Sequence, residues 1–185
     1  MTATHLSKIE RKTLMRAPRE RVWRAITDPT EFGKWFSVET AGTFQPGARV
    51  DMISTHESCK GAAFSITIER METGRLFSWR WHPGMPDPGI DYSKEPTTLV
   101  EFRLEDAPGG TLVTVTESGF DQISLDRRAR IFEENEKGCP NFLAKRKAEQ
   151  QNAIEQLGPK LRAMMPFLNP IVAPGLETTA ASAKK

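Results

Sequence analysis

The sequence is poor in the side chains that bind metal ions and form disulfides. Its three histidines are His5, His56 and His82, and no two of them stand at a metal-ligand spacing. Its two cysteines, Cys59 and Cys139, lie far apart and belong to no CxxC pair. We therefore expect neither a metal site nor a disulfide framework, and we expect no cofactor.

Long apolar runs and an excess of charge of one sign are also missing. No stretch approaches the about eighteen uninterrupted apolar residues of a membrane span, and residues 1–7 contain no apolar leader. The 26 Lys and Arg residues nearly balance the 24 Asp and Glu residues, whereas nucleic-acid-binding domains carry a marked basic excess. These absences predict a cytoplasmic protein that neither inserts into a membrane nor binds nucleic acid.

The chain of 185 residues is long enough for one domain with tails. Apolar residues make up 38% of it and charged residues 27%, which is typical of a globular protein. The segment after Pro166 is rich in Ala, Thr, Pro and Lys and has little to bury. We expect a flexible N-terminus at residues 1–7, a single domain at 8–166 and a disordered tail at 167–185.

Most of the expected domain alternates apolar and polar residues with the period of a β-strand. Helical spacing of apolar residues instead predicts a short helix over residues 19–27, and Thr30 is expected to cap another helical turn through residue 36. The predicted strands cover residues 8–15, 50–57, 63–71, 76–82, 98–104 and 111–118. The last two strands form the clearest hairpin, because Pro108-Gly109-Gly110 lies between them.

Two further helices and a loop are expected in the second half of the chain. Residues 83–96 contain four prolines without a periodic apolar pattern, which predicts a long surface loop. Residues 124–136 have a helical pattern. A last helix is expected to begin at Pro140 and to continue to about Leu157, where Gly158-Pro159 interrupts it.

Several strings in the chain resemble one known family. They are Ala17-Pro18 followed by Val22-Trp23-Arg24-Ala25-Ile26-Thr27-Asp28-Pro29, Lys34-Trp35-Phe36, Phe77-Ser78-Trp79-Arg80-Trp81, Gly109-Gly110-Thr111, Thr114-Val115-Thr116-Glu117-Ser118-Gly119-Phe120, Arg127-Arg128 and Asn135-Glu136-Lys137-Gly138. These strings and the order of elements resemble the START-like, or SRPBCC, superfamily, in the branch named after the Hsp90 ATPase activator Aha1. The resemblance covers roughly residues 8–161.

The resemblance implies an α+β, helix-grip fold. In that fold a curved antiparallel sheet of six to seven strands wraps a long C-terminal helix, with two short helices after the first strand. An apolar cavity then lies between the sheet and the last helix. The residues expected to line it are Trp35, Phe36, Met52, His56, Phe77, Trp79, Trp81, Glu117, Lys147 and Ile154.

Two ionisable residues are the candidates for chemistry in this cavity. His56 continues the strand face of Met52, and Glu117 continues the face of Val115, so either side chain could point inward and change its ionisation through burial. The alternative interpretation is that both residues, near strand ends, reach solvent. In the corresponding alternative for the other residues, the aromatic side chains of Phe77, Trp79 and Trp81 only fill the core, and Lys147 lies on a solvated helix face.

Three functions stay open at this point. The first is a binding module that holds a small apolar or lipid-like molecule. The second is an enzyme of the cyclase, dehydratase or hydrolase type, in which His56 or Glu117 moves a proton. The third is a chaperone-associated or stress-response protein, for which the resemblance suggests Hsp90 as partner. A homodimer is also compatible with the sequence. No GxSxG, GxGxxG or P-loop pattern is present.

Overall fold

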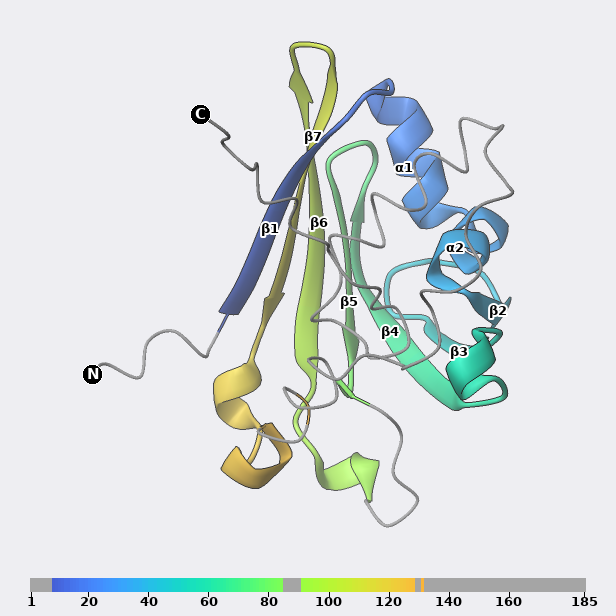
Figure 1. Cartoon of the computed structure of the whole chain (residues 1–185), viewed down its shortest axis with the longest axis vertical. Helices are drawn as coiled ribbons and strands as arrows, with labels where there is room; N and C mark the ends of the chain where they lie inside the picture. The colour runs from blue at the N-terminus through green and yellow to red at the C-terminus, as the bar shows by residue number, and fades with distance from the viewer. Residues whose placement is uncertain (1–7, 85–90, 129–130, 132–185) are drawn as a thin grey trace, which may run out of the picture.

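The computed structural model describes residues 8–84, 91–128 and 131 of the chain. Seven antiparallel strands form one sheet in the order β1-β7-β6-β5-β4-β3-β2. The strands are β1 (Lys8–Met15), β2 (Val38–Ala41), β3 (Arg49–Ser54), β4 (Ala63–Glu72), β5 (Leu76–Trp81), β6 (Thr98–Ala107) and β7 (Gly110–Ser118). Because β1 pairs with β7, the first and last of the described strands are neighbours (Figure 1). The α+β class and the expected number of strands are confirmed.

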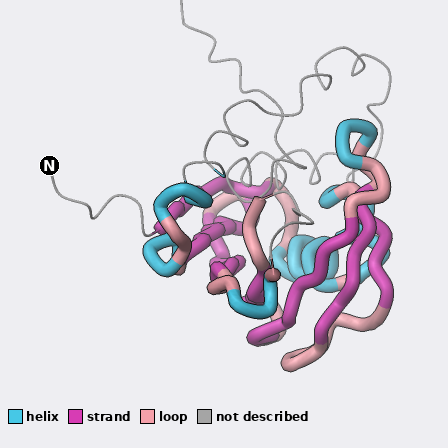
Figure 2. Tube along the Cα trace, turned by 90° about the horizontal axis from the view of Figure 1, so that it is seen from below, coloured by secondary structure: helices cyan, strands magenta, loops and turns pink. Residues whose placement is uncertain are grey.

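Two short helices follow β1 and lie on the inner side of the curved sheet (Figure 2). They are α1 (Arg19–Thr27) and α2 (Pro29–Phe36). The carboxylate of Asp28 accepts a hydrogen bond of 2.8 Å from the backbone N–H of Glu31. Proline occupies the first position of α2, where its missing N–H costs no hydrogen bond. The cap is therefore Asp28, and the expectation that Thr30 caps this helix is wrong.

The core consists of aromatic rings that α2 and the sheet bring together. Alternation along β5 directs Phe77, Trp79 and Trp81 to the face that α2 covers. The ring centroids of Phe32 and Trp79 are 5.8 Å apart, and those of Phe36 and Trp81 are 6.2 Å apart. All five side chains are buried. The aromatic face of β5 thus packs against α2 within the described part of the chain.

The strand predicted over residues 50–57 ends earlier than its alternation suggests. β3 stops at Ser54, whose hydroxyl accepts a hydrogen bond of 3.2 Å from the backbone N–H of His56. The same hydroxyl lies 3.3 Å from the sulfur of Cys59. This local hydrogen bonding turns the chain into η2 (Glu57–Cys59), a short 3-10 helix. His56 therefore lies beyond the strand, and the prediction that it continues the strand face is wrong.

The described segments between and after the strands contain two further short 3-10 helices. They are η3 (Tyr92–Lys94), within the predicted loop over residues 83–96, and η4 (Phe120–Gln122), just after β7. Residues 125–128 are helical, as the pattern over 124–136 predicts. The predicted last helix, the tail and the N-terminal segment 1–7 lie outside the described residues. None of the described helices is long and apolar enough to cross a membrane.

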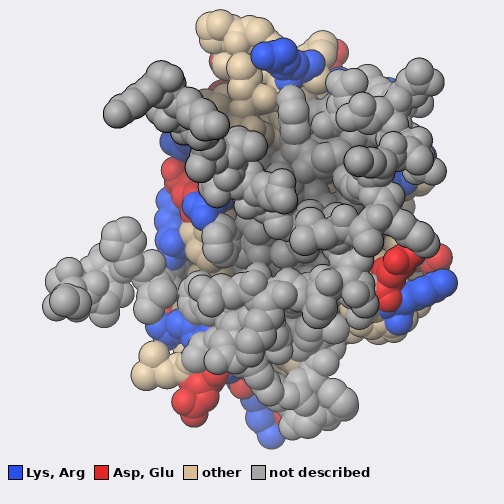
Figure 3. Space-filling model, in the orientation of Figure 1, with Lys and Arg blue, Asp and Glu red and all other residues tan. Residues whose placement is uncertain are grey.

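Charges of both signs alternate along β1, at one edge of the sheet. Glu10 forms ion pairs of 3.0 Å with Lys8 and 3.4 Å with Lys12. In the surface view, basic and acidic side chains occupy the margin where β1 lies (Figure 3). These three side chains point to the outer face of the sheet, because they alternate with Ile9 and Thr13, which are half-buried.

Candidate functional site

Glu117 is a fully buried carboxyl group on the inner face of the sheet. It lies on β7 opposite Val100 of β6, and it shares the inner face with Val113 and Val115. Its Oε1 accepts a hydrogen bond of 2.9 Å from the indole Nε1 of Trp81. The same oxygen accepts a second hydrogen bond of 2.5 Å from the hydroxyl of Thr98. Three neighbouring strands thus hold one oxygen of this carboxyl group.

The second oxygen of Glu117 has no hydrogen-bond partner within the described part of the chain. Burial raises the pKa of Glu117 to about 8, although the hydrogen bonds from Thr98 and Trp81 act in the opposite direction. At neutral pH the group is therefore mostly a carboxylic acid. Since Oε1 already accepts two hydrogen bonds, the proton belongs on Oε2, which makes that oxygen a donor.

A second unpaired polar atom lies in the same row of the sheet. Trp79 pairs with Val100, and Val100 pairs with Glu117, so Trp79 and Glu117 face the same side from strands two apart. The indole Nε1 of Trp79 is buried and has no partner among the described residues. Buried polar groups in proteins are normally hydrogen-bonded, so two unpaired groups in one row need an explanation.

His56 does not join this group. Three strands, β4, β5 and β6, separate β3, after which His56 lies, from β7, which carries Glu117. His56 is half-buried in the turn after β3. The sheet order therefore gives no pairing of an acid with a base across neighbouring strands.

The other predicted site residues divide into two groups. Trp81 contacts Glu117 directly, whereas Trp35, Phe36, Met52, Phe77 and Trp79 are buried within the aromatic and aliphatic core. The indole Nε1 of Trp35 donates a hydrogen bond of 2.8 Å to the backbone oxygen of Ala25, which fixes α2 against α1. Lys147 and Ile154 lie outside the described residues.

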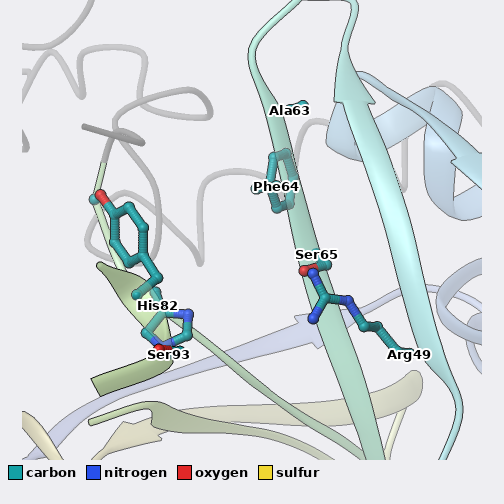
Figure 4. Close-up of a pocket in the computed structure, with 8 residues that line it drawn as sticks. Arg49, Ala63, Phe64, Ser65, His82 and Ser93 are labelled. Carbon is teal, nitrogen blue, oxygen red and sulfur yellow. The ribbon is translucent and has the colours of Figure 1, made fainter. Parts of the chain in front are cut away.

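A pocket of about 360 Å³ is lined by residues of β3, of β4 and of the segment after β5 (Figure 4). It lies between the start of β4 and the segment that follows β5. Its lining residues are Arg49, Ala63, Phe64, Ser65, His82, Gly84, Tyr92 and Ser93. None of them is among the residues predicted to line a cavity. Alternation alone places Ser65 and His82 on the outer face, and only the end of the β4–β5 ladder shows that a space lies between them.

The wall of this pocket after β5 is fixed by a buried arginine. The guanidinium of Arg127 is paired with the Glu95 carboxylate at 2.6 Å and donates to the backbone oxygen of Pro83 at 3.1 Å. It also lies 4.9 Å from the ring centroid of Tyr92. The backbone oxygen of Glu95 lies 3.1 Å from Nε2 of His82. Since a carbonyl oxygen can only accept, Nε2 carries a proton.

Within the described residues, no three side chains of His, Cys, Asp or Glu stand close enough together to hold a metal ion. The chemistry that these residues offer is therefore hydrogen bonding, apolar contact and proton donation by Glu117. Cys59, which is buried, lies next to Ser54 and away from Glu117 in the sheet order.

A comparison with models of protein families shows the family of this chain. The family model described as "Activator of Hsp90 ATPase homolog 1-like protein" matches residues 16–146, which is more than half of the chain. The chain belongs to this family. The matched region of this family member includes α1, α2, the strands β2 to β7 and the whole of the candidate site.

Solved structures show the same fold. Protein MLL2253 from Mesorhizobium loti is 22% identical to this family member, with a TM-score of 0.56 over 81% of this chain and 95% of that one. Protein Ms6760 from Mycobacterium smegmatis is 17% identical, with a TM-score of 0.57 over 85% and 92% of the two chains. Protein NE0264 from Nitrosomonas europaea is 15% identical, with a TM-score of 0.55 over 87% and 99%. The predicted SRPBCC helix-grip fold is thereby confirmed.

Proposed function

We propose that this protein binds a small apolar or lipid-like molecule at the inner face of its sheet, between the sheet and the predicted C-terminal helix. The observation that carries the proposal is the unpaired, buried Oε2 of Glu117. A buried carboxyl group with one unpaired oxygen destabilises an apolar core, by about 1–3 kcal/mol of folding free energy relative to a fully paired group. A ligand that completes the hydrogen bonding would recover that cost.

The ionisation of Glu117 defines the ligand's polar group. A carboxylic acid at Oε2 donates a hydrogen bond, so the ligand needs an acceptor such as a carbonyl, ether or hydroxyl oxygen. Apolar side chains supply the rest of the contact, because most buried neighbours of Glu117 in the described sheet are aliphatic or aromatic. The ligand is therefore a mainly apolar molecule with one acceptor oxygen and no negative charge near Glu117.

Proton donation by Glu117 is the second candidate function. A carboxyl group with a pKa of about 8 is protonated at neutral pH and can act as a general acid. His56 is no partner in such a reaction, because it lies after β3, which three strands separate from β7. An interaction with an Hsp90-type chaperone stays a prediction that rests on the description of the family.

The test combines native mass spectrometry of freshly purified protein with a thermal-shift screen of apolar ketones, ethers and alcohols at pH 7. We expect a ligand that stabilises the wild type and whose affinity falls as pH rises through about 8, because ionised Glu117 no longer donates. Glu117→Gln keeps a donor in place of Oε2, so its binding should not change with pH. Glu105→Gln, on the exposed face of β6, is the matched control and should behave like the wild type.

Three results would separate the candidates. Conversion of a bound ligand, seen as a mass change that Glu117→Gln abolishes, would support the enzyme. Binding without a mass change would support the binding module. Failure of every screened molecule to bind, or binding by the wild type that is independent of pH between 6 and 9, would contradict the role proposed for Glu117.

A further inference from the structure

The sheet opens where β4 extends beyond the end of β5. The β4–β5 register begins at Thr67 and Arg80, and the same register would place Ser65 opposite His82. The strand β5 ends at Trp81, however, and Pro83 follows shortly after it. Residues 63–66 of β4 are therefore paired with β3 on one side, and have no β5 partner within the described chain on the other.

Backbone groups of β4 consequently face the opening. In an antiparallel sheet the backbone groups of successive residues point alternately to the two neighbouring strands. The N–H and C=O of Ile68 bond to Ala48 and Gly47 on the β3 side. By alternation, those of Ser65 point toward the β5 side, where the pocket of about 360 Å³ lies. A volume of this size is at the small end of ligand pockets, which span about 300–1,000 Å³.

The side chains around the opening combine one cation with aromatic and hydroxyl groups. Arg49 reaches from β3 across β4, so that its guanidinium lies beside Ser65, while His82 and Ser93 face them from the other side (Figure 4). Phe64 and Tyr92 add two aromatic rings to the lining. None of the described lining residues is acidic. The carboxylate nearest along β3 is Asp51, whose Oδ1 lies 3.4 Å from Nε of Arg49.

The geometry points to a second binding site in this pocket, for a small aromatic carboxylate. The planar ring of such a ligand fits between Phe64 and Tyr92, and its carboxylate meets the guanidinium of Arg49 and the hydroxyl group of Ser65. The hydroxyl group of Ser93 already donates a hydrogen bond of 2.6 Å to Asp91, so Ser93 lines the pocket without donating to the ligand. The pair of Arg49 with Asp51 is long, at 3.4 Å, and exposed to solvent, so a ligand carboxylate can compete for the guanidinium. A phosphate would carry nearly two charges into a pocket whose described lining has a single permanent cation.

The far wall of the site is held in place before any ligand arrives. Arg127 is only 7% exposed, and it ties Glu95, Pro83 and the ring of Tyr92 together. A preformed wall lowers the entropic cost of binding, because the ligand does not have to order it. Arg127 is therefore a positioning residue of this site rather than a ligand contact.

The polar side of this site lies on the opposite face of the sheet from Glu117. Arg49 and Ser65 lie on the outer face of the sheet, since they alternate with the buried Val50 and Ile66, whereas Glu117 lies on the inner face. Phe64 alternates with Ser65, and its ring centroid lies 6.2 Å from that of Trp81, which bonds to Glu117. The two proposals can still fail separately, because one is tested by the charge of Arg49 and the other by the ionisation of Glu117.

The test is a titration of the full chain with benzoate, followed by two-dimensional amide NMR at pH 7. Benzamide, which is neutral, and benzylammonium, which is cationic, have the same ring and serve as ligand controls. We expect benzoate to shift the amide signals of Ser65, His82 and Ser93 and to bind about five- to tenfold more tightly than benzamide, because charge-assisted hydrogen bonds are the stronger ones. Benzylammonium should not bind.

Three variants complete the test. Arg49→Gln should abolish the preference for benzoate over benzamide. Arg103→Gln is the matched control, because Arg103 is also exposed and also pairs with an acidic residue two positions away on its strand, yet lies on β6. Ser93→Trp should fill the pocket and block all binding without a change of charge. The site is overturned by equal binding of benzoate and benzamide, by equal effects of the two arginine variants, or by no binding.

Discussion

The ionisation of a single residue, Glu117, makes the free energy of unfolding depend on pH. An unfolded chain releases the proton of this carboxyl group near its ordinary pKa of 4.5, whereas the folded chain keeps the proton until about pH 8. Between these values the folded state binds more protons than the unfolded state. The free energy of unfolding therefore falls as pH rises through this window, by at most about 1.4 kcal/mol per pH unit.

Replacing Glu117 with Gln should remove this dependence. The amide has nearly the same shape, stays neutral, and its oxygen can accept the hydrogen bonds from Trp81 and Thr98. Urea unfolding at pH 5, 6, 7 and 8 should show Glu117→Gln gaining stability relative to the wild type as pH rises. Glu105→Gln, an exposed change of the same charge, should follow the wild type. Parallel curves for the wild type and Glu117→Gln would show that the carboxyl group ionises normally.

Replacing Arg127 should lower the stability of the fold and loosen the segment around η3. Arg127→Gln removes the ion pair to Glu95 and the donor to Pro83, and we expect a loss of about 1–3 kcal/mol in the free energy of unfolding. Hydrogen exchange of residues 91–97 should accelerate as well, because these contacts fix η3. Arg103→Gln disrupts only an exposed pair and is the control. Equal effects of the two variants would mean that Arg127 is not a structural anchor.

The local elements of the fold follow directly from sequence pattern. The strand over 8–15, the helix over 19–27 and the hairpin around Gly109-Gly110 form as predicted, because alternation, helical spacing and turn residues act within a few positions. β2 was missed, since its four residues form a strand only by pairing with β3. Alternation does not predict the early end of β3, because that end depends on the hydrogen bond that the backbone N–H of His56 donates to the Ser54 hydroxyl.

The candidate site shows the same division between local and distant causes. Alternation was enough to place Glu117 on the inner face with Val115. The pocket beside β4 could not be found in this way, because it exists only where the β4–β5 ladder stops. The unpaired Oε2 depends likewise on which side chains three strands bring together, and no sequence spacing encodes that.

The β6–β7 hairpin depends on a glycine that also touches β1. A Cβ at Gly110 would lie 2.0 Å from the backbone oxygen of Met15, whereas a Cβ at Gly109 would meet nothing within 4 Å. Both residues have positive φ angles, +152° and +84°. Gly109→Ala should therefore cost about 1 kcal/mol of conformational strain. Gly110→Ala should cost about 1–3 kcal/mol more, because the hairpin and β1 must move apart.

Chemical denaturation of the two alanine variants measures this difference. The two glycines are adjacent and both have positive φ angles, but Gly109 is exposed and faces no other atoms, whereas Gly110 is half-buried and faces the backbone of Met15. Equal losses of stability in Gly109→Ala and Gly110→Ala would show that β1 does not pack closely against the hairpin.

At the scale of the whole molecule, the sheet is open and its described strands end in two edges, β1 and β2. An edge strand exposes unpaired backbone groups that can pair with a second molecule, and charged side chains, above all lysine, oppose this. The alternating charges of Lys8, Glu10 and Lys12 occupy the β1 edge. We infer that these charges oppose pairing of β1 with a strand of a second copy.

Removing these charges should make the protein self-associate. We expect the triple variant Lys8→Thr, Glu10→Thr and Lys12→Thr to form dimers or larger oligomers that increase with concentration, as measured by size-exclusion chromatography with light scattering. The matched control replaces Arg80, Arg103 and Glu105 with Thr on β5 and β6, which have a neighbouring strand on both sides and so offer no edge. Because both variants lose three charges and gain three threonines, a difference between them isolates the edge. Association of both variants, or of neither, would mean that the charges on β1 do not control how these molecules meet.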